Sequence, residues 1–331
     1  MIDYSSAQRP VGSSGAPDSA GELLAAHKSR PTWAEVNLDN LARNLRVIKQ
    51  MIAPDVAVMS AIKADAYGHG AVGCSRALQQ AGVEWFGVAL PEEGEKLREA
   101  GIVRPILCLG GFWEGQEELV ISQSLTPAIF RLDLLERLDR VAGQTGCVTD
   151  YHLKIDTGMG RLGVPLSGLP DFLDAVGRLQ NVRLDGIMTH MASADDPAFS
   201  AYTDSQLNLF DEAMGLVKVR RHSPKWIHAA NSAATLAFPG SRGNMVRLGG
   251  LLYGMWRDTV DPMFSSIDRR PVMSVRSTIM LVKTYPAGSQ IGYGCTYTTD
   301  RESLIATVPI GYSDGLRRSL SNMGHVLVKG R

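Results

Sequence analysis

The sequence of 331 residues predicts an α/β protein: a (β/α)8 TIM-type barrel followed by an all-β domain that is truncated at its C-terminal end. Two observations predict the barrel. Eight short apolar runs alternate with amphipathic segments between residues 57 and 254, and the runs are apolar almost throughout, as in parallel strands covered on their outer face. A third observation predicts the second domain, because short β-branched runs broken by Gly, Pro and Asp follow residue 270.

The predicted barrel strands are separated by stretches with the pattern of helices. The clearest of these stretches span residues 91–101, 131–143 and 201–219. Because the alternation alone also suits a doubly wound open sheet, that topology is kept as the alternative. In chain order, the eight runs are VAVMSAIKA, WFGVAL, RPILCLG, LTPAIF, YHLKIDT, LDGIMTHM, WIHAANS and MVRLGGLLYG.

Changes in composition divide the chain into three parts. Residues 1–30 are rich in Ser, Gly, Ala and Pro and are predicted to be a flexible tail. The barrel is expected over residues 31–260 and the β-domain over residues 270–331. The last strand pattern, Val326–Lys329, has no later strand pattern to pair with, so we expect the β-domain to be incomplete at its C-terminal end.

The gross composition argues against several classes of partner. The 34 Lys and Arg balance the 34 Asp and Glu, which gives no electrostatic reason to expect nucleic acid or an anionic membrane. No apolar run reaches the roughly 18 residues of a membrane-spanning helix. The four cysteines lie far apart, so we expect neither a metal site nor a disulfide framework, and the protein is predicted to be cytoplasmic with reduced thiols.

Polar residues gather where the predicted barrel strands end, which is where barrel enzymes keep their active sites. Lys63 ends the first strand, His190 and Ser232 lie at later strand ends, and Arg247 opens the eighth strand. Lys63 is the most unusual of them. A half-buried strand end disfavours the ammonium form and lowers a lysine pKa, as a nucleophilic amine requires. We therefore predict an active site around Lys63.

Six motifs make the chain resemble the alanine racemase family, whose members use pyridoxal 5'-phosphate and combine a barrel with a β-domain. The resemblance runs from about Arg30 to the end of the chain. It implies interconversion of L-alanine and D-alanine, which supplies D-alanine for peptidoglycan, and a homodimer with shared active sites. In chain order, the motifs are AIKADAYGHGA, KIDTGMGRLG, MTHMASADD, HAANSAA, VRLGGLLYG and IGYGCTYT.

The resemblance also implies a role for individual residues. Lys63 would hold the cofactor as a Schiff base and act as one of two bases at Cα, and Tyr293, from the neighbouring subunit, would be the other base. His190 and Arg247 would support that tyrosine and the pyridine nitrogen, and Arg161 would bind the substrate carboxylate. Lys154 matches a lysine that many members carry carbamylated. The phosphate would be bound by Tyr67, Ser232, Gly249 and Gly250, with Lys63 and Arg247 completing the cofactor site.

Several alternatives stay open at this point. The family continues past the VKGR ending with a segment that contributes to substrate and phosphate binding, so we expect the present chain to racemise alanine poorly. A racemase of serine or of broad specificity would look similar, and so would a pyridoxal-phosphate-binding barrel with little activity. A basic-amino-acid decarboxylase of the same architecture would not need the tyrosine of IGYGCTYT.

Overall fold

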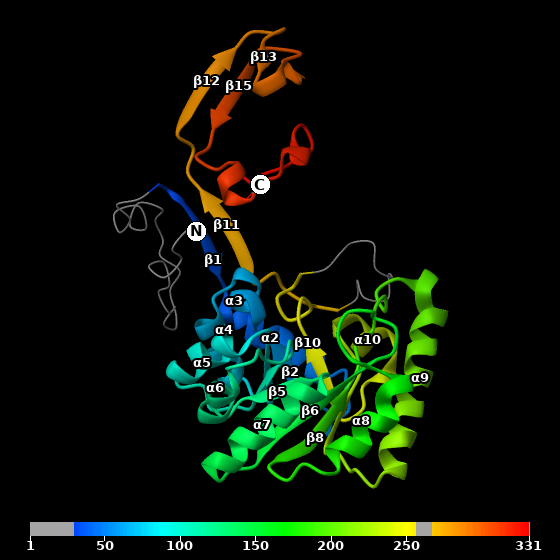
Figure 1. Ribbon diagram of the computed structural model, residues 1–331. Helices are drawn as coiled ribbons and strands as arrows, with labels where there is room; N and C mark the ends of the chain where they lie inside the picture. The colour runs from blue at the N-terminus through cyan, green and yellow to red at the C-terminus, as the bar shows by residue number, and fades with distance from the viewer. Residues whose placement is uncertain (1–29, 256–266, 331) are drawn as a thin grey trace. The chain divides into compact units, whose positions relative to one another are not determined.

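The computed structural model describes residues 30–255 and 267–330, which form two compact units (Figure 1). Of the described residues, 37–255 and 267–272 belong to one unit, and 30–36 and 273–330 belong to the other. The predicted N-terminal tail lies outside the described residues except for Arg30, and so does most of the segment between the two predicted domains.

The larger unit is a parallel barrel, as predicted. Its sheet follows the order β10-β2-β3-β4-β5-β6-β8-β9, and every neighbouring pair is parallel. Two backbone hydrogen bonds join β9 to the segment of β10: Asn244 N–H donates to Ile227 O (3.1 Å) and Arg247 N–H donates to Ala230 O (3.0 Å). The strands are β2 (Ala57–Ala61), β3 (Trp85–Val88), β4 (Ile106–Cys108), β5 (Thr126–Ile129), β6 (Thr149–Asp156), β8 (Val182–Met188), β9 (Trp226–His228) and β10 (Met245–Leu248).

Each of the eight predicted apolar runs overlaps one of these strands, so the barrel prediction is confirmed and the open sheet is not formed. The short β7 (Val164–Pro165) pairs only with β6. The three predicted helices are α5 (Pro91–Glu99), α7 (Leu132–Thr145) and α9 (Ser200–Val219). The other helices are α2 (Leu38–Lys49), α3 (Lys63–Gly68), α4 (Ala71–Gln80), α6 (Glu117–Ser122), α8 (Leu169–Val176) and α10 (Ser232–Ala237).

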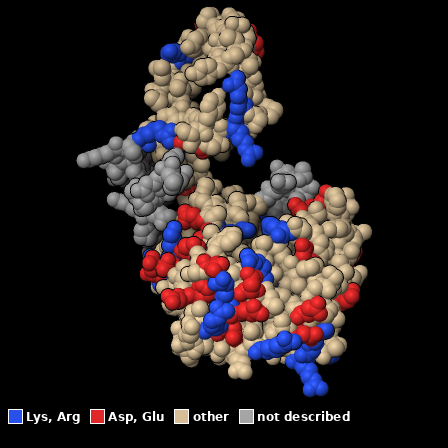
Figure 2. Space-filling view, in the orientation of Figure 1, with Lys and Arg blue, Asp and Glu red and all other residues tan. Residues whose placement is uncertain are grey.

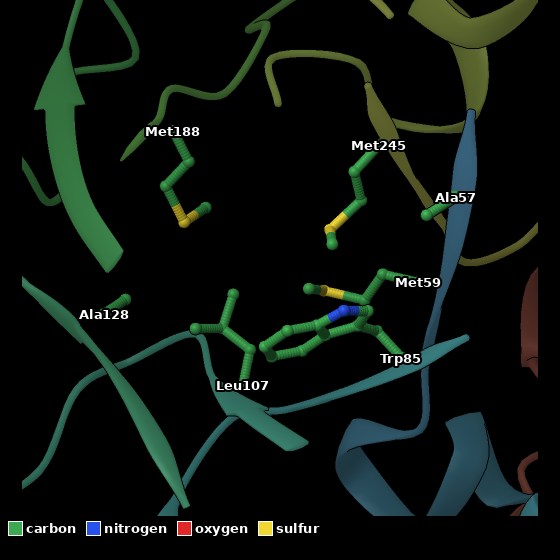
Figure 3. Packing of buried hydrophobic residues seen from close by; sticks show 7 residues of the cluster. All are labelled: Ala57, Met59, Trp85, Leu107, Ala128, Met188 and Met245. Carbon is green, nitrogen blue, oxygen red and sulfur yellow. The ribbon is translucent and has the colours of Figure 1, made fainter. Parts of the chain in front are cut away.

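Apolar periodicity explains how the helices cover the barrel. Helix α7 buries Leu134, Leu135, Leu138 and Ala142, whose spacings of one, three and four residues place them on one face. Inside the barrel, side chains from six strands meet in one cluster (Figure 3). These side chains pack the barrel interior, and barrels of this kind receive their ligands where the strands end. The members of the cluster are Ala57, Met59, Trp85, Leu107, Ala128, Met188 and Met245.

Charged side chains of both signs are interspersed over the face of the barrel unit in Figure 2. Several form ion pairs, such as Arg137 with Glu114 (2.7 Å) and Arg183 with Asp150 (2.6 Å). Within the described ranges, no helix is long and apolar enough to cross a membrane. The four cysteines are free thiols.

The smaller unit consists of three antiparallel strand pairs. Strand β1 (Thr32–Val36) pairs with β11 (Met273–Ser277), although the sequence placed residues 32–36 in the range of the barrel. Strand β12 (Leu281–Tyr285) pairs with β15 (Ser303–Thr307), and β13 (Gln290–Ile291) pairs with β14 (Tyr297–Thr298). These pairs confirm a β-domain.

The predicted strand at Val326–Lys329 is wrong. The chain is irregular there, and the side chains of Val326 and Leu327 are 78% and 79% exposed. A β pattern becomes a strand only when its backbone groups pair with a neighbour, and none of the described segments pairs with this one.

Candidate active site

A cavity of about 540 Å³ opens where the barrel strands end. It is lined by residues that lie in or follow β2, β6, β8, β9 and β10, so the parallel strands bring together side chains far apart in the sequence. All nine site residues predicted in the barrel line this cavity. They are Lys63, Tyr67, Lys154, Arg161, His190, Ser232, Arg247, Gly249 and Gly250.

Lys63 follows β2, a strand buried along its whole length, and begins α3. The four residues after it, Ala64 to Tyr67, are left-handed, with φ between +51° and +56°. A left-handed helical turn of L-residues costs roughly 1–2 kcal/mol per residue, so contacts from outside the turn must hold it. Burial lowers the pKa of Lys63, the nearby Arg161 lowers it further, and Glu93 opposes them. The predicted lowering of this amine's pKa agrees with this environment.

Tyr67, Ser232 and Gly249 form a small polar group on one wall of the cavity. The Gly249 N–H donates to the Ser232 hydroxyl oxygen (2.9 Å). A Cβ added at position 249 would lie 2.6 Å from the Tyr67 hydroxyl oxygen, so only glycine leaves room for the tyrosine here. Burial raises the pKa of Tyr67, which keeps its phenol protonated and able to donate. The arrangement presents hydroxyl donors that suit an anion.

Arg247 lies on β10 and is buried, and the acceptors that its guanidinium meets among the described residues are all neutral. Its acceptors are the carbonyl oxygens of Thr189 (2.6 Å), His228 (2.8 Å) and Ala229 (2.9 Å), and the Nδ1 atoms of His228 (3.0 Å) and His190 (3.3 Å). Burial lowers the pKa of Arg247 to about 9, so it is still charged at neutral pH.

Because a guanidinium only donates, it fixes the tautomers of the histidines around it. His190 and His228 must each accept at Nδ1 and carry the proton on Nε2. His228 Nε2 then donates to Nδ1 of His152 (2.9 Å), and His152 Nε2 points toward Asp185 at 3.9 Å. Burial lowers the pKa of all three imidazoles, that of His190 to about 2, so they are neutral.

His152 is a part of this network that the sequence reasoning missed. The alternation of side chains along β6 could have identified it. Residues two apart in a strand share a face, so His152 lies on the same face as Lys154, which lines the cavity. Its ring also packs against Trp85, with the ring centroids 5.3 Å apart. His152 therefore connects the site to the apolar interior of the barrel.

Lys154 and Arg161 add two further positive charges. Lys154 is only 4% exposed, and burial together with Arg247 lowers its pKa to about 8. Arg161 lies in the loop after β6. Asp156 Oδ1 holds that loop by accepting the N–H groups of Gly158 (3.0 Å) and Gly160 (3.1 Å). From helix α9, the Tyr202 hydroxyl donates to Gly158 O (2.7 Å).

Tyr293 belongs to the other unit, where it begins a short 3-10 turn, Tyr293–Cys295. Its side chain is 84% exposed. The described chain thus gathers nine of the ten predicted site residues in one cavity and places the tenth on a surface of the β-domain.

Comparisons with known proteins agree with this architecture. Residues 36–256 match the family model described as alanine racemase, N-terminal domain, and residues 272–331 match alanine racemase, C-terminal domain. A relative from Halothermothrix orenii named alanine racemase is 42% identical over 304 residues, which is 92% of this chain and 79% of the relative.

Two solved structures extend the comparison. A structure of alanine racemase from Streptomyces lavendulae is 34% identical and gives a TM-score of 0.85, covering 92% of this chain and 80% of that one. A structure of alanine racemase from Bartonella henselae with covalently bound pyridoxal phosphate is 26% identical and gives a TM-score of 0.76, covering 88% of this chain and 79% of that one.

Proposed function

The chain belongs to the alanine racemase family, a family of pyridoxal-phosphate-dependent isomerases, and from this premise we propose that Lys63 and Tyr293 are the two bases with which it interconverts L-alanine and D-alanine. The observation that carries the proposal is the single cavity in which Lys63, Arg247 and the group of Tyr67, Ser232 and Gly249 meet. Family membership leaves the decarboxylase without support.

The residues around the cavity fit pyridoxal phosphate. The Ser232 hydroxyl already accepts from Gly249 N–H, so its proton is available to the phosphate, as is that of Tyr67. Because position 249 has no Cβ, the Tyr67 hydroxyl can lie close to the backbone there, beside the Ser232 hydroxyl. Gly250 also lines the cavity and would offer its N–H. When bound, the cofactor supplies an electron sink for the negative charge that develops at Cα.

Arg247 would donate to the pyridine nitrogen and leave it unprotonated. A charged guanidinium has no lone pair with which to accept that nitrogen's proton. Its carbonyl and imidazole acceptors hold it in place without neutralising it. This arrangement makes a weaker electron sink than a carboxylate partner would, and we infer that it disfavours side reactions such as transamination.

Acid–base roles follow from the state of each group. The lowered pKa of Lys63 leaves more of its amine neutral and able to take a proton from D-alanine. Tyr293 would serve the proton of L-alanine from a second copy of the chain, since its exposed phenol lies outside the barrel unit. Neutral His190, with its proton on Nε2, could donate to that phenol oxygen. The protein is accordingly proposed to be a homodimer with shared sites.

Substrate binding is assigned to Arg161, whose guanidinium suits a carboxylate. Lys154 is proposed to carry a carbamate. Its pKa of about 8 leaves a larger neutral fraction than an ordinary lysine has, and only a neutral amine adds carbon dioxide. A carbamate would place a negative charge among Lys63, Arg161 and Arg247, which are the cations that depress that pKa.

The proposal is tested with L-alanine in deuterated water. Formation of D-alanine with deuterium at Cα is expected, and release of carbon dioxide or absence of exchange would contradict it. Borohydride reduction of the loaded protein, followed by peptide mapping, should place pyridoxal phosphate on Lys63. The exposed Lys283 is the internal control, and a label there or on Lys154 would overturn the assignment.

A further inference from the structure

Glu93 lies at the start of α5 and does not line the cavity, yet both oxygens of its carboxylate are occupied by backbone donors. Oε1 accepts the N–H of Ala64 (2.7 Å). Oε2 accepts the N–H groups of Ala89 (2.6 Å) and Leu90 (3.3 Å). Ala64 directly follows Lys63, whereas Ala89 and Leu90 follow β3. One carboxylate therefore joins the loops after two neighbouring barrel strands.

The contact to Ala64 matters because of the backbone that follows Lys63. Four consecutive non-glycine residues, Ala64 to Tyr67, are left-handed, and a conformation of this kind persists only where the surroundings hold it. The first residues of a helical turn also have N–H groups without a partner inside the turn. Glu93 supplies that partner for Ala64. At the other end of the turn, Asp65 Oδ1 accepts the N–H of Ala71 (2.7 Å).

We propose that Glu93 is a positioning residue for Lys63: by holding the N–H of Ala64, it fixes the direction in which the lysine leaves β2 and enters the cavity. This inference rests on the proposed link between Lys63 and the cofactor. A carboxylate is required because both oxygens accept. The amide of glutamine has one acceptor oxygen, and its NH2 group would face another N–H donor.

Two ligands, pyridoxal phosphate and pyridoxamine phosphate, distinguish a role of Glu93 in positioning Lys63 from a general role in stabilising the fold. Pyridoxal phosphate can be joined to Lys63 through its aldehyde carbon, with release of one water and no change of oxidation state. Pyridoxamine phosphate shares the ring and the phosphate but cannot be joined. The full chain is titrated with each ligand as wild type, Glu93→Gln and Glu92→Gln. Glu92 is the matched control, because it is exposed and its carboxylate accepts from Gln116 (2.6 Å).

The expected result is selective. Glu93→Gln should lose about tenfold or more in affinity for pyridoxal phosphate, the loss of one charged hydrogen bond, and about twofold or less for pyridoxamine phosphate. The fraction of pyridoxal phosphate that borohydride fixes to Lys63 should fall with it. Glu92→Gln should match wild type. The amount of pyridoxamine phosphate bound at saturation also gives the number of folded sites. For a variant that partly unfolds, the amount of pyridoxal phosphate bound is therefore divided by that number before it is compared with wild type.

If Glu93→Gln gives no folded protein, Glu93→Asp takes its place. Its carboxylate is one methylene shorter and cannot bridge both loops, so the same selective loss is expected. Unchanged affinities, or an equal loss for both ligands, would overturn the positioning role. A wild-type chain in which borohydride fixes no pyridoxal phosphate to Lys63 would instead refute the proposed function itself, and this inference with it.

Discussion

Replacing Gly249 with alanine should weaken the binding of pyridoxal phosphate more than the same replacement at other glycines does. The new Cβ would lie 2.6 Å from the Tyr67 hydroxyl oxygen and 3.3 Å from its Cζ. Either the tyrosine ring or the backbone must move, and the backbone N–H is tied to Ser232 Oγ at 2.9 Å. Inserting a methyl group into a packed site costs roughly 1–3 kcal/mol. If the strain falls on the bound state, the dissociation constant rises about 5- to 150-fold.

The assay is a fluorescence titration of apoprotein with pyridoxal phosphate, together with a thermal melt. Gly73→Ala in α4 is the matched control, because its Cβ would meet nothing within 4 Å. That change should leave cofactor affinity unaltered and stabilise the helix by about 0.5–1 kcal/mol. Gly250→Ala should be intermediate, since its Cβ would lie 3.3 Å from Met255 O. Wild-type affinity in Gly249→Ala would refute the assignment of Tyr67 and Gly249 to the phosphate.

Acid should destabilise the protein through its buried imidazoles. Burial lowers the pKa of His190 and His228, so below about pH 6.5 the unfolded chain binds more protons than the folded one. The free energy of unfolding by urea should then fall by roughly 1.4 kcal/mol per pH unit for each imidazole, and a midpoint that does not move would contradict this. In competitive acetylation of protein freed of carbon dioxide, so that Lys154 is an amine, Lys154 should reach half of its maximal rate near pH 8, well below exposed lysines, whereas identical profiles would argue against its lowered pKa. Mixing inactive Lys63→Ala and Tyr293→Phe chains should restore activity, because each mixed dimer has one intact site; no recovery despite confirmed subunit exchange would count against shared sites.

The barrel was predictable because its strands are apolar on both faces and short relative to the helices between them. That pattern is local, and each of the eight runs overlaps a strand. Most of the site was predictable for a related reason. In a parallel barrel, all strand ends lie on one side, so Lys63, His190 and Arg247 could be grouped before their distances were known.

Features that depend on long-range approach could not be predicted from the sequence. The partner of β1 is β11, and Thr32 lies opposite Ser277, with the whole barrel between them in the chain. The role of Glu93 depends on its reach from α5 to Ala64, and in the sequence it is one of several acids in an exposed helix pattern. At Val326–Lys329 the sequence predicts a strand that the structure does not form, since local propensity alone does not supply a strand partner.

The charge balance of the cavity connects folding with catalysis. Lys63, Lys154, Arg161 and Arg247 line it, whereas Asp195 is the acid among the described lining residues. These cations disfavour one another, which is part of the reason that the pKa values of both lysines are lowered. Anions in the cavity would relieve that repulsion, and any ligand that binds only the folded chain adds to its stability. The proposed cofactor phosphate, substrate carboxylate and Lys154 carbamate would be three such anions. Burial and the same repulsion lower the pKa of Lys63 before any anion binds. The cation cluster that makes the unliganded site electrostatically unfavourable would therefore also favour the neutral amine that the proposed role of Lys63 requires.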